Sequence, residues 1–159
     1  MKWMRYGKPS VLGVVTGMVA GLGTITPASG FVGPMGAVAI GLSAGTVCFF
    51  ATQFLKRKLE IDDSLDVSPV HGVGGVIGTL LTGVFGAVAL GGVGFPVQQG
   101  MLAQVGVQAL GVGAAALWCG VLTWVILKIV AVPVRLRVSE EKETEGLDLA
   151  EHGERGYSQ

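Results

Sequence analysis

Charged residues are absent from two long stretches of the chain, and this pattern predicts helices that lie in a membrane. Residues 9–55 contain no Asp, Glu, Lys or Arg, and residues 67–127 contain none either. An element on the surface of a soluble protein needs a polar face, so charges would recur every few residues. Since a helix crosses the hydrocarbon core with roughly 20 apolar residues, each stretch has room for two crossings and a turn.

Proline, glycine and charge divide these stretches into four predicted transmembrane helices, at about 11–25, 33–55, 70–90 and 102–132. Pro27 ends the first helix, because proline lacks an amide donor and disfavours helix in the residue before it. A basic cluster at 56–58 ends the second, a glycine-rich loop at 91–96 follows the third, and Pro133 stops the fourth.

These boundaries predict an all-α membrane protein. Residues 1–134 form its membrane domain, and residues 135–159 form a charged tail in water. Basic residues that flank membrane helices stay in the cytoplasm. Here they occur in the N-terminal flank, the second loop and the C-terminal flank, and the first and third loops have none: Lys2, Arg5 and Lys8; Lys56, Arg57 and Lys58; Lys128, Arg135 and Arg137. We therefore expect a multi-pass protein of the cell membrane with both termini of this chain in the cytoplasm.

Small residues recur at every fourth position in three of the predicted helices, so that they share one helix face. The rows are Gly13, Gly17 and Gly21; Gly33, Ala37, Gly41 and Gly45; Gly74, Gly78, Thr82 and Gly86. In a bilayer, rows of this kind let helix backbones approach closely. With 27 glycines in the chain, the pattern predicts a compact bundle whose helices meet along these rows.

Composition excludes several other classes of protein. Eleven basic and eleven acidic residues give a net charge of zero, so no basic surface for nucleic acid is expected. Cys48 and Cys119 lie in apolar surroundings, and their spacing matches no zinc or redox motif. The sequence contains no nucleophile–base pair, metal-ligand cluster or phosphate loop, so we expect neither an enzyme nor a cofactor or metal.

His71 is the one ionisable residue near the third predicted helix. An ionisable group in a bilayer favours a functional role, since a neutral imidazole donates from one nitrogen and accepts at the other. The alternative is a histidine that hydrogen-bonds a neighbouring helix. Gly72, Gly74 and Gly75 either line a narrow path beside it or admit a partner helix.

Acidic residues precede this helix, and their simplest role is structural. Asp62 and Asp63 are expected to cap the helix start. There, carboxylates accept hydrogen bonds from free amides and interact favourably with the helix dipole. Asp66, five residues before His71, is expected to anchor the entrance to the helix.

Several longer motifs resemble the ammonium transporter family (Amt/Mep/Rh). They are residues 21–33 (GLGTITPASGFVG), 55–66 (LKRKLEIDDSLD), 70–75 (VHGVGG) and 145–154 (EGLDLAEHGE). The resemblance implies an eleven-helix fold that assembles as a homotrimer with one pore per subunit. It also implies that this chain corresponds to the last four helices and the cytoplasmic tail. Ser68-Pro69 departs from the Phe-Gly pair expected before the histidine.

The same resemblance assigns roles to individual residues. His71 would be the second of two pore histidines that support deprotonation of ammonium, and Thr26 would lie near the pore wall. Asp66 would be structural. The tail would be regulatory and cooperate with a PII signalling protein, through the residues that carry the likeness: Gly146, Leu147, Asp148, His152, Gly153 and Glu154. From composition alone, the tail is a solvated charged segment.

We therefore interpret the chain as a fragment of a channel-type transporter that moves ammonium or ammonia across the membrane. Because four helices would leave polar groups of a half-pore facing lipid, we expect no transport by the chain alone. The alternative is a membrane fragment that does not transport but associates with full-length subunits or with PII. A membrane enzyme that uses His71 is a third and weaker interpretation.

Overall fold

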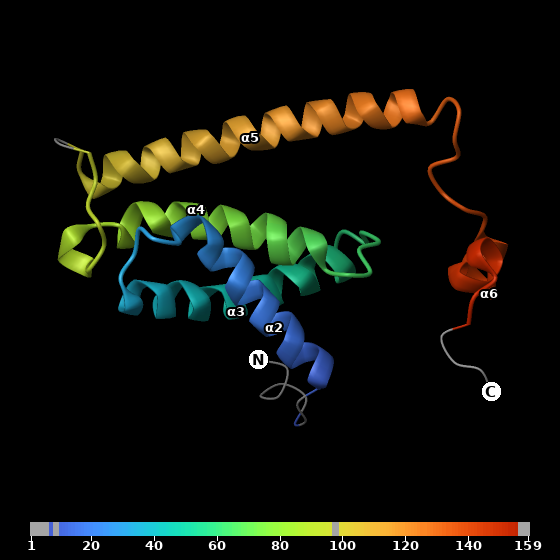
Figure 1. Ribbon diagram of the computed structural model, residues 1–159, viewed down its shortest axis with the longest axis horizontal. Coiled ribbons are helices and arrows are strands. Elements are labelled where there is room, and N and C mark those ends of the chain that lie inside the picture. The colour runs from blue at the N-terminus through green and yellow to red at the C-terminus, as the bar shows by residue number, and fades with distance from the viewer. Residues whose placement is uncertain (1–6, 8–9, 97–98, 156–159) are drawn as a thin grey trace. The chain divides into compact units, whose positions relative to one another are not determined.

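The computed structural model describes residue 7 and residues 10–96 and 99–155, and the secondary structure of the described part is all helical (Figure 1). The α-helices are α2 (Val11–Ile25), α3 (Pro34–Arg57), α4 (Gly74–Phe85), α5 (Met101–Val130) and α6 (Glu140–Glu145). Shorter helical turns are η1 (Thr26–Ala28), η2 (Ser68–Val73), η3 (Val88–Leu90) and η4 (Asp148–His152). The basic residues Lys2, Arg5 and Lys8, used above for orientation, lie outside the described residues.

Four helical segments within the described ranges are long and apolar enough to cross a membrane, which confirms the predicted number. They are Val11–Ala28, Pro34–Arg57, Ser68–Phe85 and Met101–Val130. The Ser10 hydroxyl accepts a hydrogen bond from the Gly13 amide at 3.1 Å and caps α2. Pro34 opens α3, in the first turn, where its missing amide hydrogen has no intrahelical partner to lose.

The third predicted helix was too long at its C-terminal end. Helix α4 stops at Phe85, and the chain then forms the separate turn η3. Gly91 after it adopts a φ of +82°, a left-handed conformation that glycine enters without steric cost. The close fold of this loop explains the early stop, since the Gly94 amide donates back to the Gly86 carbonyl at 2.8 Å.

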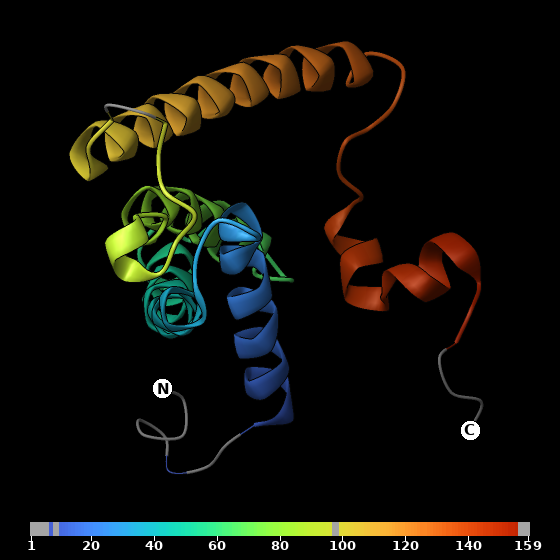
Figure 2. The same ribbon diagram turned by 60° about the vertical axis from the view of Figure 1, so that its left-hand side comes forward.

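Helices α2, α3 and α4 pack together in the first of two structural units, Met1–Ala114. Helices α3 and α4 run in opposite directions, and α2 crosses them obliquely (Figures 1 and 2). Each buries one row of mostly small residues at four-residue spacing: Ala20, Thr24 and Ala28; Gly36, Ile40, Ala44 and Cys48; Gly74, Gly78 and Thr82.

Small-residue packing was predicted correctly, but the face was wrong in two helices. The row of α4 is buried as expected. In α2 and α3 the buried rows are not those of Gly13 or Gly33, and a β-carbon added to Gly17, Gly21, Gly41 or Gly45 would meet nothing within 4 Å. Neighbouring rows contain alanine, threonine and cysteine, which fill the interface better than glycine and still permit close approach.

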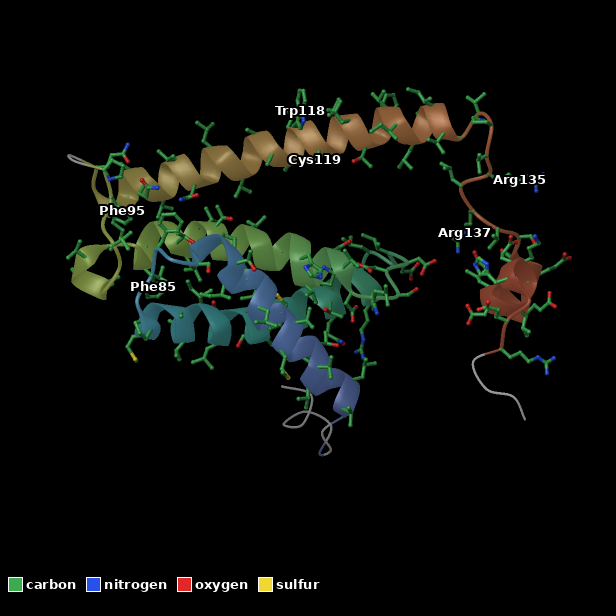
Figure 3. The ribbon with its side chains drawn as sticks, in the orientation of Figure 1. Phe85, Phe95, Trp118, Cys119, Arg135 and Arg137 are labelled. Carbon is green, nitrogen blue, oxygen red and sulfur yellow. The ribbon has the colours of Figure 1, made fainter. Side chains whose placement is uncertain are left out.

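The second unit, Ala115–Gln159, contains the end of α5 and the tail. No residue of α5 is buried within the chain; Trp118 is 68% exposed, and Cys119 beside it is exposed too (Figure 3). A helix that is apolar on all sides is typical of a membrane span. In the tail, Arg137 donates to Glu143 at 2.8 and 3.2 Å, and Lys142 donates to Glu151 at 2.7 Å.

Candidate functional site

His71 lies on a π-helical turn, η2, that leads directly into α4. Such wide turns are rare, and they occur frequently at functional sites. Pro69 and Val70 beside the histidine are buried, whereas His71 itself is exposed in this chain. The turn therefore holds its apolar residues in the bundle and presents the imidazole at the edge of the bundle.

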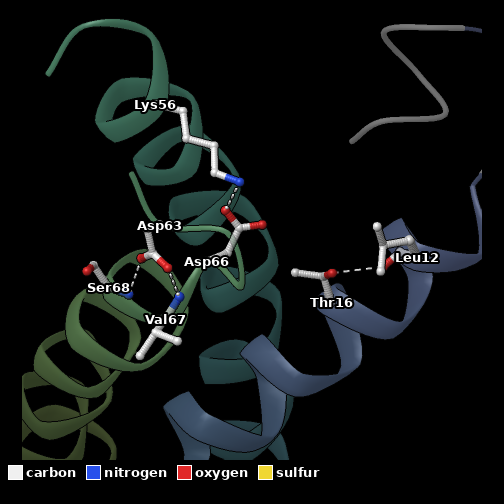
Figure 4. A network of polar contacts seen from close by, with 7 residues as sticks. All are labelled: Leu12, Thr16, Lys56, Asp63, Asp66, Val67 and Ser68. Carbon is white, nitrogen blue, oxygen red and sulfur yellow. Dashed lines mark hydrogen bonds and ion pairs between the residues drawn. The ribbon is translucent and has the colours of Figure 1, made fainter. Parts of the chain in front are cut away.

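The start of this turn is fixed by the carboxylate of Asp63, as the capping prediction required. Asp63 accepts hydrogen bonds from the amides of Val67 (2.9 Å) and Ser68 (2.7 Å), as Figure 4 shows. These donated bonds, first that from Ser68 and then that from Val67, hold the pKa of the Asp63 carboxyl below its usual value. The charged carboxylate thus stabilises the amide groups that begin the His71 segment.

Asp66 ties the same segment to the end of α3. Its Oδ1 lies 2.8 Å from the Nζ of Lys56 (Figure 4), and the Asp66 carbonyl accepts from the Val70 amide at 3.0 Å. Asp66 adopts a φ of +57°, a left-handed conformation that is uncommon outside glycine but several-fold enriched in aspartate. Sequence reasoning found Asp66 but missed Lys56, because a basic cluster after a membrane helix is typical of orientation alone.

The other side of His71 faces α2, where sequence reasoning missed two residues, Gly23 and Thr24. A β-carbon placed on Gly23 would lie 3.6 Å from the Nδ1 of His71. Thr24 is fully buried, and a β-carbon placed on Gly74 would lie 2.6 Å from its Oγ1. For Thr24 the signal in the sequence was its four-residue spacing from Ala20 and Ala28, which glycine enrichment obscured.

The remaining predicted pore residues differ in their surroundings. Gly74 is buried against Thr24 and Cys48. Of its two predicted roles, lining a path or admitting a partner helix, it therefore has the second. A β-carbon on Gly72 or Gly75 would meet nothing within 4 Å; open space remains beside both. Thr26 is exposed on η1 and donates its hydroxyl hydrogen to the Leu22 carbonyl at 2.7 Å.

A cavity of about 470 Å³ lies between α2 and α3, with the Lys56–Asp66 ion pair on its border. Four glycines of the rows predicted to form helix contacts line it instead: Gly13, Gly17, Gly41 and Gly45. A second cavity of about 270 Å³ lies around Phe95, a residue that packs near Gly86 in the loop after α4 (Figure 3).

The predicted regulatory residues lie together in one short segment of the tail. Gly146 and Gly153 adopt positive φ angles of +101° and +64°, and they bracket η4, which includes Asp148 and His152. The Glu154 amide donates to the Asp148 carbonyl at 2.9 Å and closes the segment. Leu147 remains 47% exposed.

Four helices within the described residues that are long and apolar enough to cross a membrane, three of them closely packed, are typical of a multi-pass membrane protein. The family described as "Ammonium Transporter Family" matches residues 1–157. The chain belongs to the ammonium transporter family.

Individual relatives agree with this assignment. The chain is 45% identical over 157 residues to "Ammonium transporter" of Aquifex aeolicus, covering 99% of this chain and 37% of that protein. It is 39% identical over 158 residues to "Ammonium transporter" of Bacillus subtilis, covering 99% of this chain and 39% of that protein. Its fold matches the crystal structure of Saccharomyces cerevisiae Mep2 with a TM-score of 0.74 and 40% identity, over 88% of this chain and 33% of that one. The chain thus spans between a third and two fifths of the length of these relatives.

Proposed function

We propose that the chain forms one wall of a path for ammonium or ammonia, with His71 as the residue that contacts the solute. The observation that supports this is the placement of His71: a π-helical turn presents it at the edge of a packed bundle, with open space at Gly72 and Gly75. A neutral imidazole both donates and accepts hydrogen bonds, which suits a small solute such as ammonia.

The proposal assigns the remaining wall to further helices of the family fold. This chain then corresponds to the C-terminal four helices of an eleven-helix subunit, in a trimer in the cell membrane with the tail in the cytoplasm. By itself the chain leaves His71 exposed, and a polar group that faces lipid is unfavourable. We therefore expect no flux through the chain alone.

A chimera tests the proposal. The aligned 37% of the Aquifex aeolicus ammonium transporter is replaced by this chain, and uptake of labelled methylammonium is measured in proteoliposomes. We expect uptake by the chimera, loss of uptake in its His71→Ala variant, and no uptake by the chain alone. Uptake that persists after His71→Ala would reject His71 as the solute contact.

The tail supports a second proposal, a docking segment for a PII signalling protein. Its support is the ordered turn between Gly146 and Gly153, which leaves Leu147 half exposed beside acidic residues. The chain with and without residues 138–159 is tested for co-purification with PII and with full-length relatives. Binding that is unaffected by the deletion would reject the tail as the docking segment; association without flux would favour the non-transporting role.

A further inference from the structure

The last turn of α5 carries the first charge after a long uncharged helix. Residues 101–127 contain no charged side chain, and Lys128 follows them just before the helix ends at Val130. The Nζ of Lys128 lies 5.8 Å from the centroid of the Trp124 ring, one helical turn earlier. A tryptophan and a lysine together are typical of the layer where a membrane helix leaves the hydrocarbon and enters the lipid headgroups. This pair therefore places the end of α5 at the level of the lipid phosphates.

Positive charge at this end of α5 is not balanced by acidic residues. No Asp or Glu occurs from position 67 to position 139, whereas Arg135 and Arg137 follow Lys128 closely along the chain (Figure 3). Arg137 is paired with Glu143 in the tail. Within the part of the chain that the structure describes, neither Lys128 nor Arg135 has an acidic partner. A cation next to hydrocarbon is unfavourable without a counter-charge, so an anion from outside the chain would stabilise this end of the helix.

The surroundings of these cations fit a lipid better than a free anion. Ile129 and Val132, which lie between them in the sequence, are both more than half exposed, and no residue of α5 is buried within the chain. A phosphate ion would neutralise the charges and leave these apolar side chains uncovered, whereas a phospholipid covers them with its acyl chains as well.

We propose that the end of α5 binds an anionic phospholipid, with the lipid phosphate against the Lys128 ammonium group and beside the Trp124 ring. Arg135 adds to the attraction from the turn that follows the helix. The amides of Ala131 and Val134 still donate to carbonyls four residues earlier, so this turn keeps Arg135 close to the same layer. The inference is independent of the proposed function, because it involves neither His71 nor a transported solute.

Fluorescence quenching by brominated lipids tests this site in the full chain. Trp3→Phe and Trp118→Phe leave Trp124 as the single tryptophan, and the protein is reconstituted in vesicles that mix phosphatidylglycerol with phosphatidylcholine, one of the two being brominated. Each Lys or Arg near a membrane surface favours an anionic lipid by about fivefold. Quenching of Trp124 should therefore give a binding constant for phosphatidylglycerol at least about fivefold above that for phosphatidylcholine. Equal constants for the two lipids, or no quenching by either, would overturn the inference.

Substitutions in the same single-tryptophan protein separate the charge of Lys128 from its structural effects. Lys128→Gln should lower the preference for phosphatidylglycerol about fivefold, and Lys128→Arg, which keeps the charge, should preserve it. Arg155→Gln, near the end of the tail, is the matched control for loss of a positive charge and should change nothing. A preference that Lys128→Gln leaves intact, or that Lys128→Arg abolishes as well, would overturn the inference.

Inorganic phosphate distinguishes a lipid from a free anion at this site. Phosphate added at millimolar concentration should leave the preference for phosphatidylglycerol unchanged, because it cannot replace the contact of the acyl chains with the apolar side chains. Loss of the preference on addition of phosphate would show that the cations take a free anion and would overturn the assignment to a lipid.

Discussion

The crossing of α2 with α4 and the charged tail are stabilised in opposite ways. At the crossing, helices touch through backbone atoms, Thr24 is fully buried, and no side chain larger than hydrogen fits at Gly78. In the tail, exposed ion pairs such as Lys142–Glu151 join short turns. In a closely packed interface, an added atom strains its neighbours. Exposed ion pairs contribute little to stability and are screened by salt. The position of His71 therefore depends on the crossing, and the tail is free to rearrange.

The largest effect is expected from Gly78→Leu. A side chain at this position would collide with the Thr24 carbonyl and would also meet Pro27. Overpacking of this kind costs about 3 kcal/mol or more, so the variant should lose the folded bundle in detergent, measured by thermal unfolding and gel filtration. Gly75→Leu is the matched control, because open space surrounds Gly75. Equal stability of the two variants would contradict the close crossing.

Gly74→Ala should have a smaller effect that a second substitution reverses. The new β-carbon would lie 2.6 Å from Thr24 Oγ1 and 3.4 Å from Cys48 Sγ, at a cost of about 1–3 kcal/mol. Thr24→Ala removes the hydroxyl that the methyl group meets. A double-mutant cycle on thermal unfolding should thus give a favourable coupling, and strictly additive losses would show that the two residues do not touch.

Asp63→Ala should weaken the cap of the His71 turn in a pH-dependent way. The folded pKa of Asp63 is lowered by the amides of Ser68 and Val67, so the stabilisation is present above the unfolded pKa and is lost as the pH falls through the folded pKa. The unfolding midpoint of the variant should lie below that of the wild type at pH 7, and the two should converge in acid. A difference that stays constant with pH would exclude the charged carboxylate as the cause.

The smallest effect is expected from Lys142→Ala in the tail. Loss of the ion pair to Glu151 should return the pKa of the Glu151 carboxyl, which the lysine lowers, toward its usual value. The unfolding midpoint of the bundle should not change, and NMR of the tail should report weaker helical order, as it should for the wild type in high salt. A lowered midpoint of the bundle would show that the two regions are coupled.

The sequence predicted the class of fold because lack of charge and helix length decide membrane insertion, which requires no knowledge of packing. It also predicted the cap at Asp63, a local interaction. The prediction of which face of α2 and α3 is buried was wrong. Gly17 and Gly41 both belong to regular rows, and only the partner helix decides which row is buried. Gly23 was missed for a related reason: it lies beside a histidine that is 48 positions further along the chain.

The most direct test of His71 as a solute contact is the water access of its position in the chimera. In the His71→Cys variant, the rate of labelling by a charged, thiol-specific reagent is compared with that of the native Cys119 on apolar α5, which serves as the reference. A charged reagent enters the hydrocarbon core only at a large cost in free energy, so it reaches thiols that water reaches. We predict that the cysteine introduced at position 71 is labelled much faster than Cys119 and that ammonium slows its labelling; equal rates at the two positions would contradict the account.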